Sequence, residues 1–140
     1  CNSQPWSFVV INNQPILEQA QRRIATMGMN RFVKQAPVLI AIVLEKANLT
    51  ASLGSVIKDK EYPLLDIGIA ANNICMQAAE LGLGSCILGW FDEKGLKQLL
   101  DVPEKKRIPL VISLGYSAAI TRKKIRKPLK EIVHFNSYKR

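Results

Sequence analysis

Histidine and closely spaced cysteines are almost missing from this chain, and their scarcity excludes several kinds of site. The 140 residues contain one histidine, His134, and three cysteines, Cys1, Cys75 and Cys86, with no Cys-x-x-Cys spacing. A Ser-His-Asp or Cys-His nucleophile needs a well-placed histidine, and protein zinc sites draw on several histidines or paired cysteines. We therefore expect no histidine-based metal site and no disulfide framework, and we expect a reduced, cytoplasmic setting.

Phosphate-binding motifs and membrane segments are lacking as well. No Gly-x4-Gly-Lys-Ser/Thr sequence occurs, which excludes a P-loop. The sequence GLGS at 82–85 begins like a dinucleotide fingerprint, but it lacks the third glycine and precedes a strand instead of a helix. The most apolar segment, 63–83, carries too many polar side chains for a membrane span. Either the protein is not an enzyme, or a bound cofactor carries the reaction.

Negative charge is scarce in the last forty residues, so the positive charge gathers there. Of the formal net charge of +9, residues 101–140 contribute most, with eleven basic residues against three acidic ones. Such a run is usually a solvated tail; nucleic-acid contact and binding of a phosphate-bearing ligand are the alternatives. Without interleaved aromatics or a helix-turn-helix pattern, a small basic nucleic-acid-binding protein is the least favoured hypothesis.

Hydrophobic patterning predicts one domain, residues 1–140, that ends in an arm over 117–140. Strands are expected at 8–11, 37–44, 85–91 and 109–116, and helices at 16–25, 64–81 and 93–100. The expected helix signals are Pro15 at the start of the first helix, Gly82 after the second, and Asp92 as the cap of the third. Residues 27–30 and 45–62 are expected to be loops. The arm has little periodicity and needs a surface to lie on.

The helix at 64–81 is apolar nearly all round, except for one narrow polar stripe at helical spacing. The stripe consists of Asp66, Asn73, Gln77 and Glu80. A chain of this length has little surface of its own to cover such a helix, so we expect a second subunit to contribute the cover. The stripe is then expected to form hydrogen bonds at the subunit interface.

Five segments, taken in order, resemble the nitroreductase family of FMN-dependent flavoenzymes. They are NSQPW at 2–6, APVLIAIVL at 36–44, LLDIGIAANNICMQAAELGLGSCILGWFD at 64–92, LGY at 114–116 and IRKPLKEIV at 125–133. The resemblance implies an α+β fold with a central, mostly antiparallel sheet flanked by helices, in a domain-swapped homodimer with FMN sites built from both chains. It also implies ping-pong hydride transfer from NADH or NADPH, through flavin N5, to a nitroaromatic, quinone or similar acceptor.

The resemblance assigns the opening residues to the flavin. Asn2, Ser3 and Gln4 correspond to the polar segment beside the flavin ring, and Cys1 to a position on the substrate side. Amides and hydroxyls suit the pyrimidine edge of a flavin, which presents both donors and acceptors. The alternative is that these side chains only satisfy the backbone of a turn. Pro5 and Trp6 are interpreted as structural, with the tryptophan as a packing anchor.

Two further segments correspond to flavin contacts. Ile87, Leu88 and Gly89 match the segment that passes flavin N5, where glycine permits close approach, and Trp90 is placed at the substrate pocket. Arg126 matches an arginine that contacts the FMN phosphate, with Lys124 and Lys127 as helpers. The alternatives are a strand with one glycine that relieves crowding, and a solvated basic run. No side chain is assigned a catalytic role, since the flavin carries the chemistry.

The chain lacks one part of the family pattern. Family members normally carry a helix and an arginine-rich segment before the NSQPW position, whereas the first arginine here is Arg22. We therefore expect this chain to be truncated at its N-terminal side, and a reduced member of the family is the alternative. A non-catalytic flavin-binding or structural dimer of the same fold is the alternative hypothesis.

Overall fold

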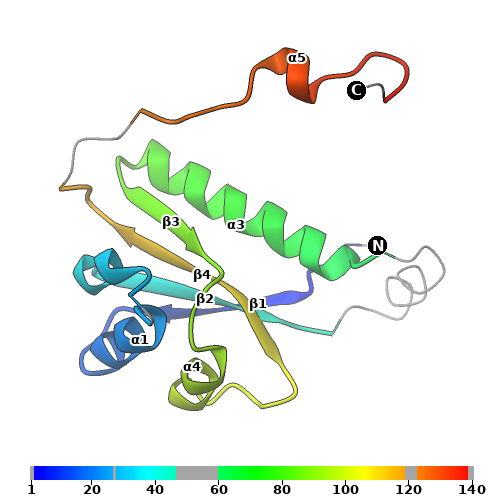
Figure 1. Cartoon of the computed structure of the whole chain (residues 1–140). Helices are drawn as coiled ribbons and strands as arrows, with labels where there is room; N and C mark the ends of the chain where they lie inside the picture. The colour runs from blue at the N-terminus through cyan, green and yellow to red at the C-terminus, as the bar shows by residue number, and fades with distance from the viewer. Residues whose placement is uncertain (1, 27, 47–59, 119–122, 139–140) are drawn as a thin grey trace.

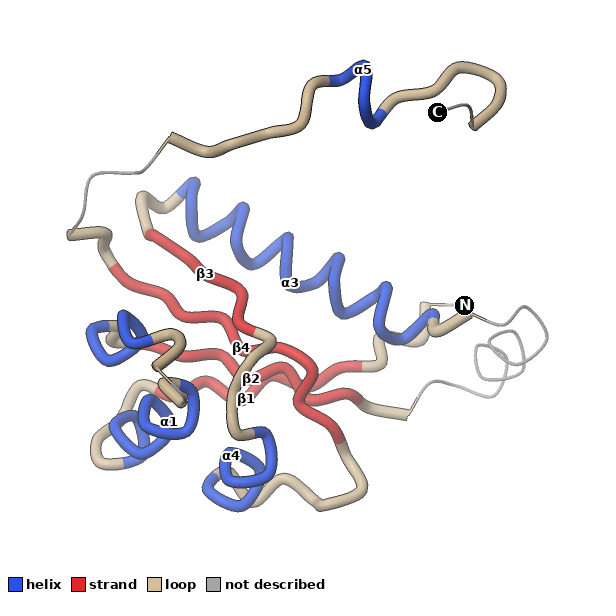
Figure 2. Tube along the Cα trace, viewed as in Figure 1, coloured by secondary structure: helices blue, strands red, loops and turns tan. Residues whose placement is uncertain are grey.

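A four-stranded sheet forms the centre of the computed structural model, which describes residues 2–26, 28–46, 60–118 and 123–138. The strands are β1 (Trp6–Ile11), β2 (Val38–Leu44), β3 (Gly84–Leu88) and β4 (Arg107–Gly115). Their order is β1-β2-β4-β3, and all neighbouring pairs are antiparallel. Figure 1 and Figure 2 show helices on both faces of this sheet. The predicted α+β fold with an antiparallel sheet is confirmed.

The two central strands are the two continuous apolar runs. In β2, Leu39, Ala41, Ile42 and Val43 are buried, and β4 buries Ile108, Val111 and Ile112. Strands with both faces covered read as unbroken hydrophobic runs, and the prediction of such a strand at 37–44 is confirmed. The edge strands β1 and β3 are more exposed.

One face of the sheet is covered by α1 (Ile16–Ile24), the 3-10 helix η1 (Arg31–Gln35) and α4 (Glu93–Leu99). The larger core lies here and contains Leu17, Ile24, Val33 and Leu96, packed with apolar residues from all four strands. The predicted cap of α4 is confirmed, because the Asp92 carboxylate accepts a hydrogen bond from the Gly95 N–H at 2.9 Å.

Among the described elements, only α3 (Tyr62–Glu80) covers the other face (Figure 1). Ile67 and Ala71 pack there against Ile42 and Ile112 in a smaller core. The opposite side of the helix is apolar and exposed, with Leu65, Ile69 and Met76 between 59% and 64% accessible. Gly82 follows the helix with a φ of +73°, the left-handed geometry predicted at this end.

The described part of the arm, residues 117–118 and 123–138, is mostly extended and includes the short helix α5 (Leu129–Ile132). Figure 1 shows the arm apart from the sheet, on the same side as α3. Its apolar side chains lie open: Ile125 is 94% exposed and Phe135 is 83% exposed. Within the described residues, the chain itself does not cover the apolar side chains of the arm.

Several sequence predictions need correction. β1 begins at Trp6 and β4 at Arg107, each two residues before its predicted start. β3 ends at Leu88 and not at residue 91, because the Asp92 N–H donates to the Arg23 carbonyl at 2.9 Å and draws the chain toward α1 and away from β4. α3 begins at Tyr62, with Pro63 in its first turn, two residues before the predicted start. η1 was not predicted, since its short sequence shows no periodicity and buries only Val33. Most of the loop predicted at 45–62 lies outside the described residues.

Candidate functional site

The polar loop formed by residues 2–4 leads into β1 in an unusual backbone conformation. Asn2 has a φ of 42° and Gln4 a φ of 45°, both in the left-handed region that few residues other than glycine adopt. The Gln4 amide donates to the Asn2 side-chain oxygen at 3.3 Å, and both side chains remain exposed. The polar loop therefore presents amide groups outward at the start of the edge strand.

The next two residues anchor this loop to the sheet. Pro5 is fully buried, and its carbonyl accepts a hydrogen bond from the Glu45 N–H at 2.9 Å. Trp6 is partly buried against the core beneath α3. The structural role predicted for Pro5 and Trp6 agrees with both observations. These contacts fix the start of β1, directly after the exposed amides of the polar loop.

The second predicted segment lies at the end of β3. Leu88 is buried beneath α4, Ile87 lies on the α3 face with 45% exposure, and Trp90 is 60% exposed. A Cβ placed on Gly89 would meet only the Leu110 Cδ2 atom, at 3.9 Å. Gly89 therefore has room on its Cβ side for at least a methyl group.

One residue that the sequence reasoning missed shapes this segment. The Asn30 side-chain amide donates to the Trp90 carbonyl at 2.7 Å, and Asn30 has a φ of 54°. Asparagine tolerates left-handed backbone better than most residues, so its position at the end of a loop was an available signal. Asn30 fixes the chain directly after Gly89 and belongs with the candidate site as a positioning residue.

A groove of about 380 Å³ lies beside β3, between η1 and the ends of β3 and β4. Its wall includes Phe32, Gln35, Cys86, Ser113 and Tyr116. Partial burial raises the pKa of the Cys86 thiol, while the charge of Lys124 opposes the shift.

Arg126 is exposed, and its guanidinium donates to the Ile125 carbonyl at 3.0 Å, within the arm. Among the residues that the structure describes, Arg126 is found in no ion pair. Its planar fork thus remains available for an anionic ligand such as a phosphate.

The predicted flavin-binding segments do not converge within one chain. The polar loop precedes β1, and residues 87–89 end β3, which are the two edge strands of the sheet. With β2 and β4 between them, three strand spacings of about 4.8 Å separate the two segments by at least ~14 Å. The arm, with Lys124 and Arg126, leaves on the α3 side. Cys1, predicted on the substrate side, lies outside the described residues.

The family model described as the nitroreductase family matches residues 1–116. The chain belongs to the nitroreductase family, as the sequence resemblance indicated.

Individual relatives agree with this family. A protein of Methanothermobacter thermautotrophicus, provisionally named an NADH dehydrogenase/NAD(P)H nitroreductase, is 30% identical over 84% of this chain. An oxygen-insensitive NADPH nitroreductase of Helicobacter pylori is 27% identical over 90% of it. The chain spans 58% of the length of the first relative and 73% of the second.

Solved structures match in fold as well. An FMN-dependent nitroreductase from Clostridium difficile R20291 superposes with a TM-score of 0.75 at 28% identity, over 96% of this chain and 77% of that one. In the described ranges of our chain, no helix has the length and apolar character needed to cross a membrane.

Proposed function

We propose that the protein is an FMN-dependent oxidoreductase that moves hydride from NADH or NADPH to a nitroaromatic, quinone or similar acceptor in a ping-pong cycle. The observation that carries the proposal is the match of residues 1–116 to the nitroreductase family. The room on the Cβ side of Gly89 and the exposed amides of the polar loop support a flat cofactor with donors and acceptors along one edge.

The residues of this chain bind and orient the cofactor. Asn2, Ser3 and Gln4 would hydrogen-bond the flavin pyrimidine edge, and residues 87–89 would lie along the N5 edge, where a backbone N–H could donate to N5. Lys124 and Arg126 hold the phosphate, and Trp90 and Cys1 line the substrate side. Bound FMN would supply a centre that accepts and returns a hydride, which amino-acid side chains do not provide.

The same proposal includes a homodimer with flavin sites built from both chains. Three observations support it: the polar loop and residues 87–89 lie at opposite edges of the sheet, the outer face of α3 exposes large apolar side chains, and the arm is uncovered. If the polar loop of one subunit faces residues 87–89 of the other, each flavin receives both segments. An arm exchanged between subunits would also bury Ile125 and Phe135.

The proposed location is the cytoplasm. The described cysteines, Cys75 and Cys86, are free thiols, which is the usual state in a reducing compartment. The proposed domain organisation is a single domain with the arm at 117–140.

An absorption spectrum tests the cofactor directly. The purified protein, mixed with excess FMN and then desalted, should retain the flavin bands near one FMN per chain. Addition of NADH or NADPH without oxygen should bleach these bands, and a quinone should restore them. A protein that stays colourless would contradict the proposal. FMN binding with no bleaching by either dinucleotide would instead identify the non-catalytic flavin-binding dimer.

A further inference from the structure

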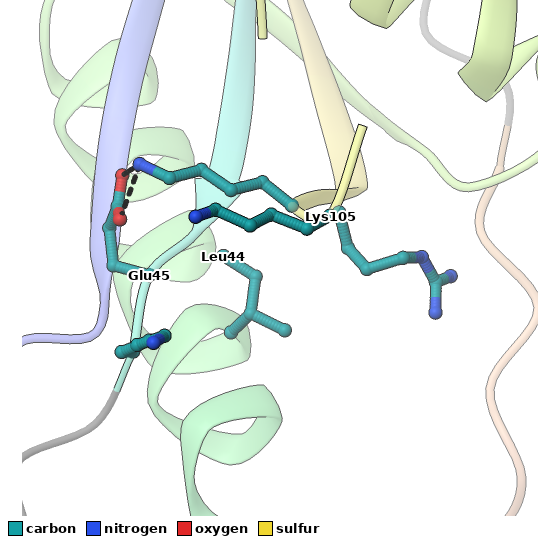
Figure 3. A pocket seen from close by; sticks show the side chains of 6 residues that line it. Leu44, Glu45 and Lys105 are labelled. Carbon is teal, nitrogen blue, oxygen red and sulfur yellow. Dashed lines mark hydrogen bonds and ion pairs between the residues drawn. The ribbon is translucent and has the colours of Figure 1, made fainter. Parts of the chain in front are cut away.

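A basic pocket of about 550 Å³ lies where β2 ends and β4 begins, away from the arm. It is lined by Leu44, Glu45, Lys46, Lys105, Lys106 and Arg107. Four of these side chains are cationic and one is acidic. Figure 3 shows Lys105 extended across the pocket, above Leu44 and toward Glu45. The pocket thus joins an apolar base to an excess of positive charge.

Two of the four cations are already matched by carboxylates. The Lys106 ammonium lies 2.7 Å from Glu45 Oε2, and Arg107 Nε lies 2.9 Å from Glu93 Oε1. Lys46 and Lys105 have no ion pair with any carboxylate among the described residues. The pocket therefore contains two ammonium groups whose charge is available to a ligand.

The segment that carries Lys105 is held in place by its own hydrogen bonds. The Lys106 N–H donates to the Pro103 carbonyl at 2.9 Å and closes a turn. The Lys97 ammonium donates to the carbonyls of Glu104 at 2.7 Å and Lys106 at 3.0 Å. A turn fixed at both ends presents its side chains at a lower entropic cost than a free loop does.

The pocket is linked directly to the polar loop of the candidate flavin site. The Glu45 N–H donates to the Pro5 carbonyl at 2.9 Å, and the Ser7 hydroxyl donates to Glu45 Oε1 at 2.7 Å. Residues 2–4 come immediately before this contact. The basic pocket therefore adjoins the proposed flavin site, and a molecule that reaches the flavin beside the polar loop would also lie near the pocket.

We propose that the basic pocket binds a phosphate group of the nicotinamide dinucleotide that reduces the flavin, with Lys46 and Lys105 as its specific contacts. This inference rests on the proposed function, since that function supplies the dinucleotide. Ammonium groups bind phosphate as strong point charges with several donors each. The volume exceeds that of one phosphate and leaves room for the sugar beside Leu44.

The test measures binding of NADP⁺, NAD⁺ and inorganic pyrophosphate by calorimetry, on the full chain as purified. In the variant Lys46→Gln/Lys105→Gln, Kd for NADP⁺ should rise by about tenfold. This is about the loss expected for one charge-assisted hydrogen bond, because solvent weakens both contacts. An equal rise for NAD⁺ and pyrophosphate would assign the pocket to the pyrophosphate. A rise confined to NADP⁺ would assign it to the 2′-phosphate.

The matched control is Lys34→Gln/Lys94→Gln, which removes the same charge from two exposed lysines outside the pocket. This control should change Kd by less than about twofold, since neither side chain lines the pocket and exposed charges are screened by salt. An unchanged Kd in the pocket variant, or an equal rise in the control, would overturn the inference.

The failure of the inference can be distinguished from failure of the proposed function. If the pocket variant binds FMN and oxidises NADPH with unaltered KM, the pocket assignment falls and the oxidoreductase stands. If the protein never binds FMN but pyrophosphate binding still depends on Lys46 and Lys105, the pocket stands as a phosphate site and the oxidoreductase falls.

Discussion

The Glu45 carboxylate joins the end of β2 to the start of β4, because the Lys106 ammonium lies 2.7 Å from Glu45 Oε2. The same carboxylate accepts a hydrogen bond from the Ser7 hydroxyl at 2.7 Å. Three of the four strands thus meet through one side chain beside the polar loop. The stability of this end of the sheet therefore depends on the ionisation of Glu45.

Acid should weaken this contact in a defined range of pH. Hydrogen bonds from Lys106 and Ser7 hold the pKa of Glu45 below its ordinary value. A carboxyl whose pKa is lowered by folding contributes stability above its unfolded pKa, about 4.3, and loses that contribution as pH falls through its folded pKa. The melting temperatures of the wild type and Glu45→Gln, measured between pH 7 and pH 3, should therefore become equal as the pH falls.

The control for this comparison is Glu104→Gln, in the turn before β4, which removes an exposed carboxylate with no ion pair among the residues described. The difference in melting temperature between this variant and the wild type should stay nearly constant over the same range of pH. If the difference in melting temperature between Glu45→Gln and the wild type is also constant, Glu45 is not the group that makes stability depend on pH.

Replacement of Gly95 should destabilise the fold through contact and not through backbone geometry. A Cβ on Gly95 would collide with Asp92 Oδ2 and lie 2.9 Å from Arg23 Cδ, so the α4 cap and the Arg23–Asp92 ion pair would both move. We expect Gly95→Ala to lower the free energy of unfolding by about 1–3 kcal/mol, as overpacking typically does. Urea denaturation measures this change.

Gly68→Ala in α3 should have the opposite effect on the free energy of unfolding. A Cβ at Gly68 would meet nothing within 4 Å. Alanine in an open helical position is favoured over glycine by about 0.5–1 kcal/mol, so this variant should be slightly more stable than the wild type. Equal destabilisation by both substitutions would argue against the specific collision at Asp92.

A substitution at Gly89 separates flavin binding from folding. Because a Cβ there approaches only Leu110 Cδ2, at 3.9 Å, Gly89→Ala should leave the melting temperature of the flavin-free protein unchanged. If the flavin passes against this backbone, the added methyl should raise Kd for FMN by roughly tenfold or more, equivalent to about 1.4 kcal/mol. Fluorescence quenching of FMN measures the affinity. An unaltered Kd would remove Gly89 from the proposed contact.

The exposed face of α3 should determine the oligomeric state. Ile69→Lys and Met76→Lys place charges on side chains that are 62% and 64% exposed in the single chain. Burial of an unpaired charge in a dimer interface is strongly unfavourable, so each variant should shift the protein toward monomer in sedimentation experiments. Val10→Lys, on β1 and 57% exposed, is the matched control outside this face. A wild type that sediments as a monomer would contradict the proposed dimer.

Local sequence signals identified most elements because the cause of each element is local. Asp92 caps α4 through a carboxylate that reaches the N–H three residues on, and Gly82 ends α3 in a conformation that glycine adopts freely. The apolar runs of β2 and β4 revealed central strands, since burial on both faces leaves no room for alternation. The early end of β3 was not predictable in this way, because it depends on Arg23, far away in the chain.

The sequence by itself determined the family, the strands and the residue types suited to a flavin, because these depend on composition and order along the chain. Only the tertiary structure decided that the polar loop and Gly89 lie at opposite edges of one sheet, since strand order follows from long-range packing. Lys46 and Lys105 are distant in sequence, yet the antiparallel pairing of β2 with β4 brings them to one pocket. Pairing between strands sets which side chains meet, and no local pattern encodes it.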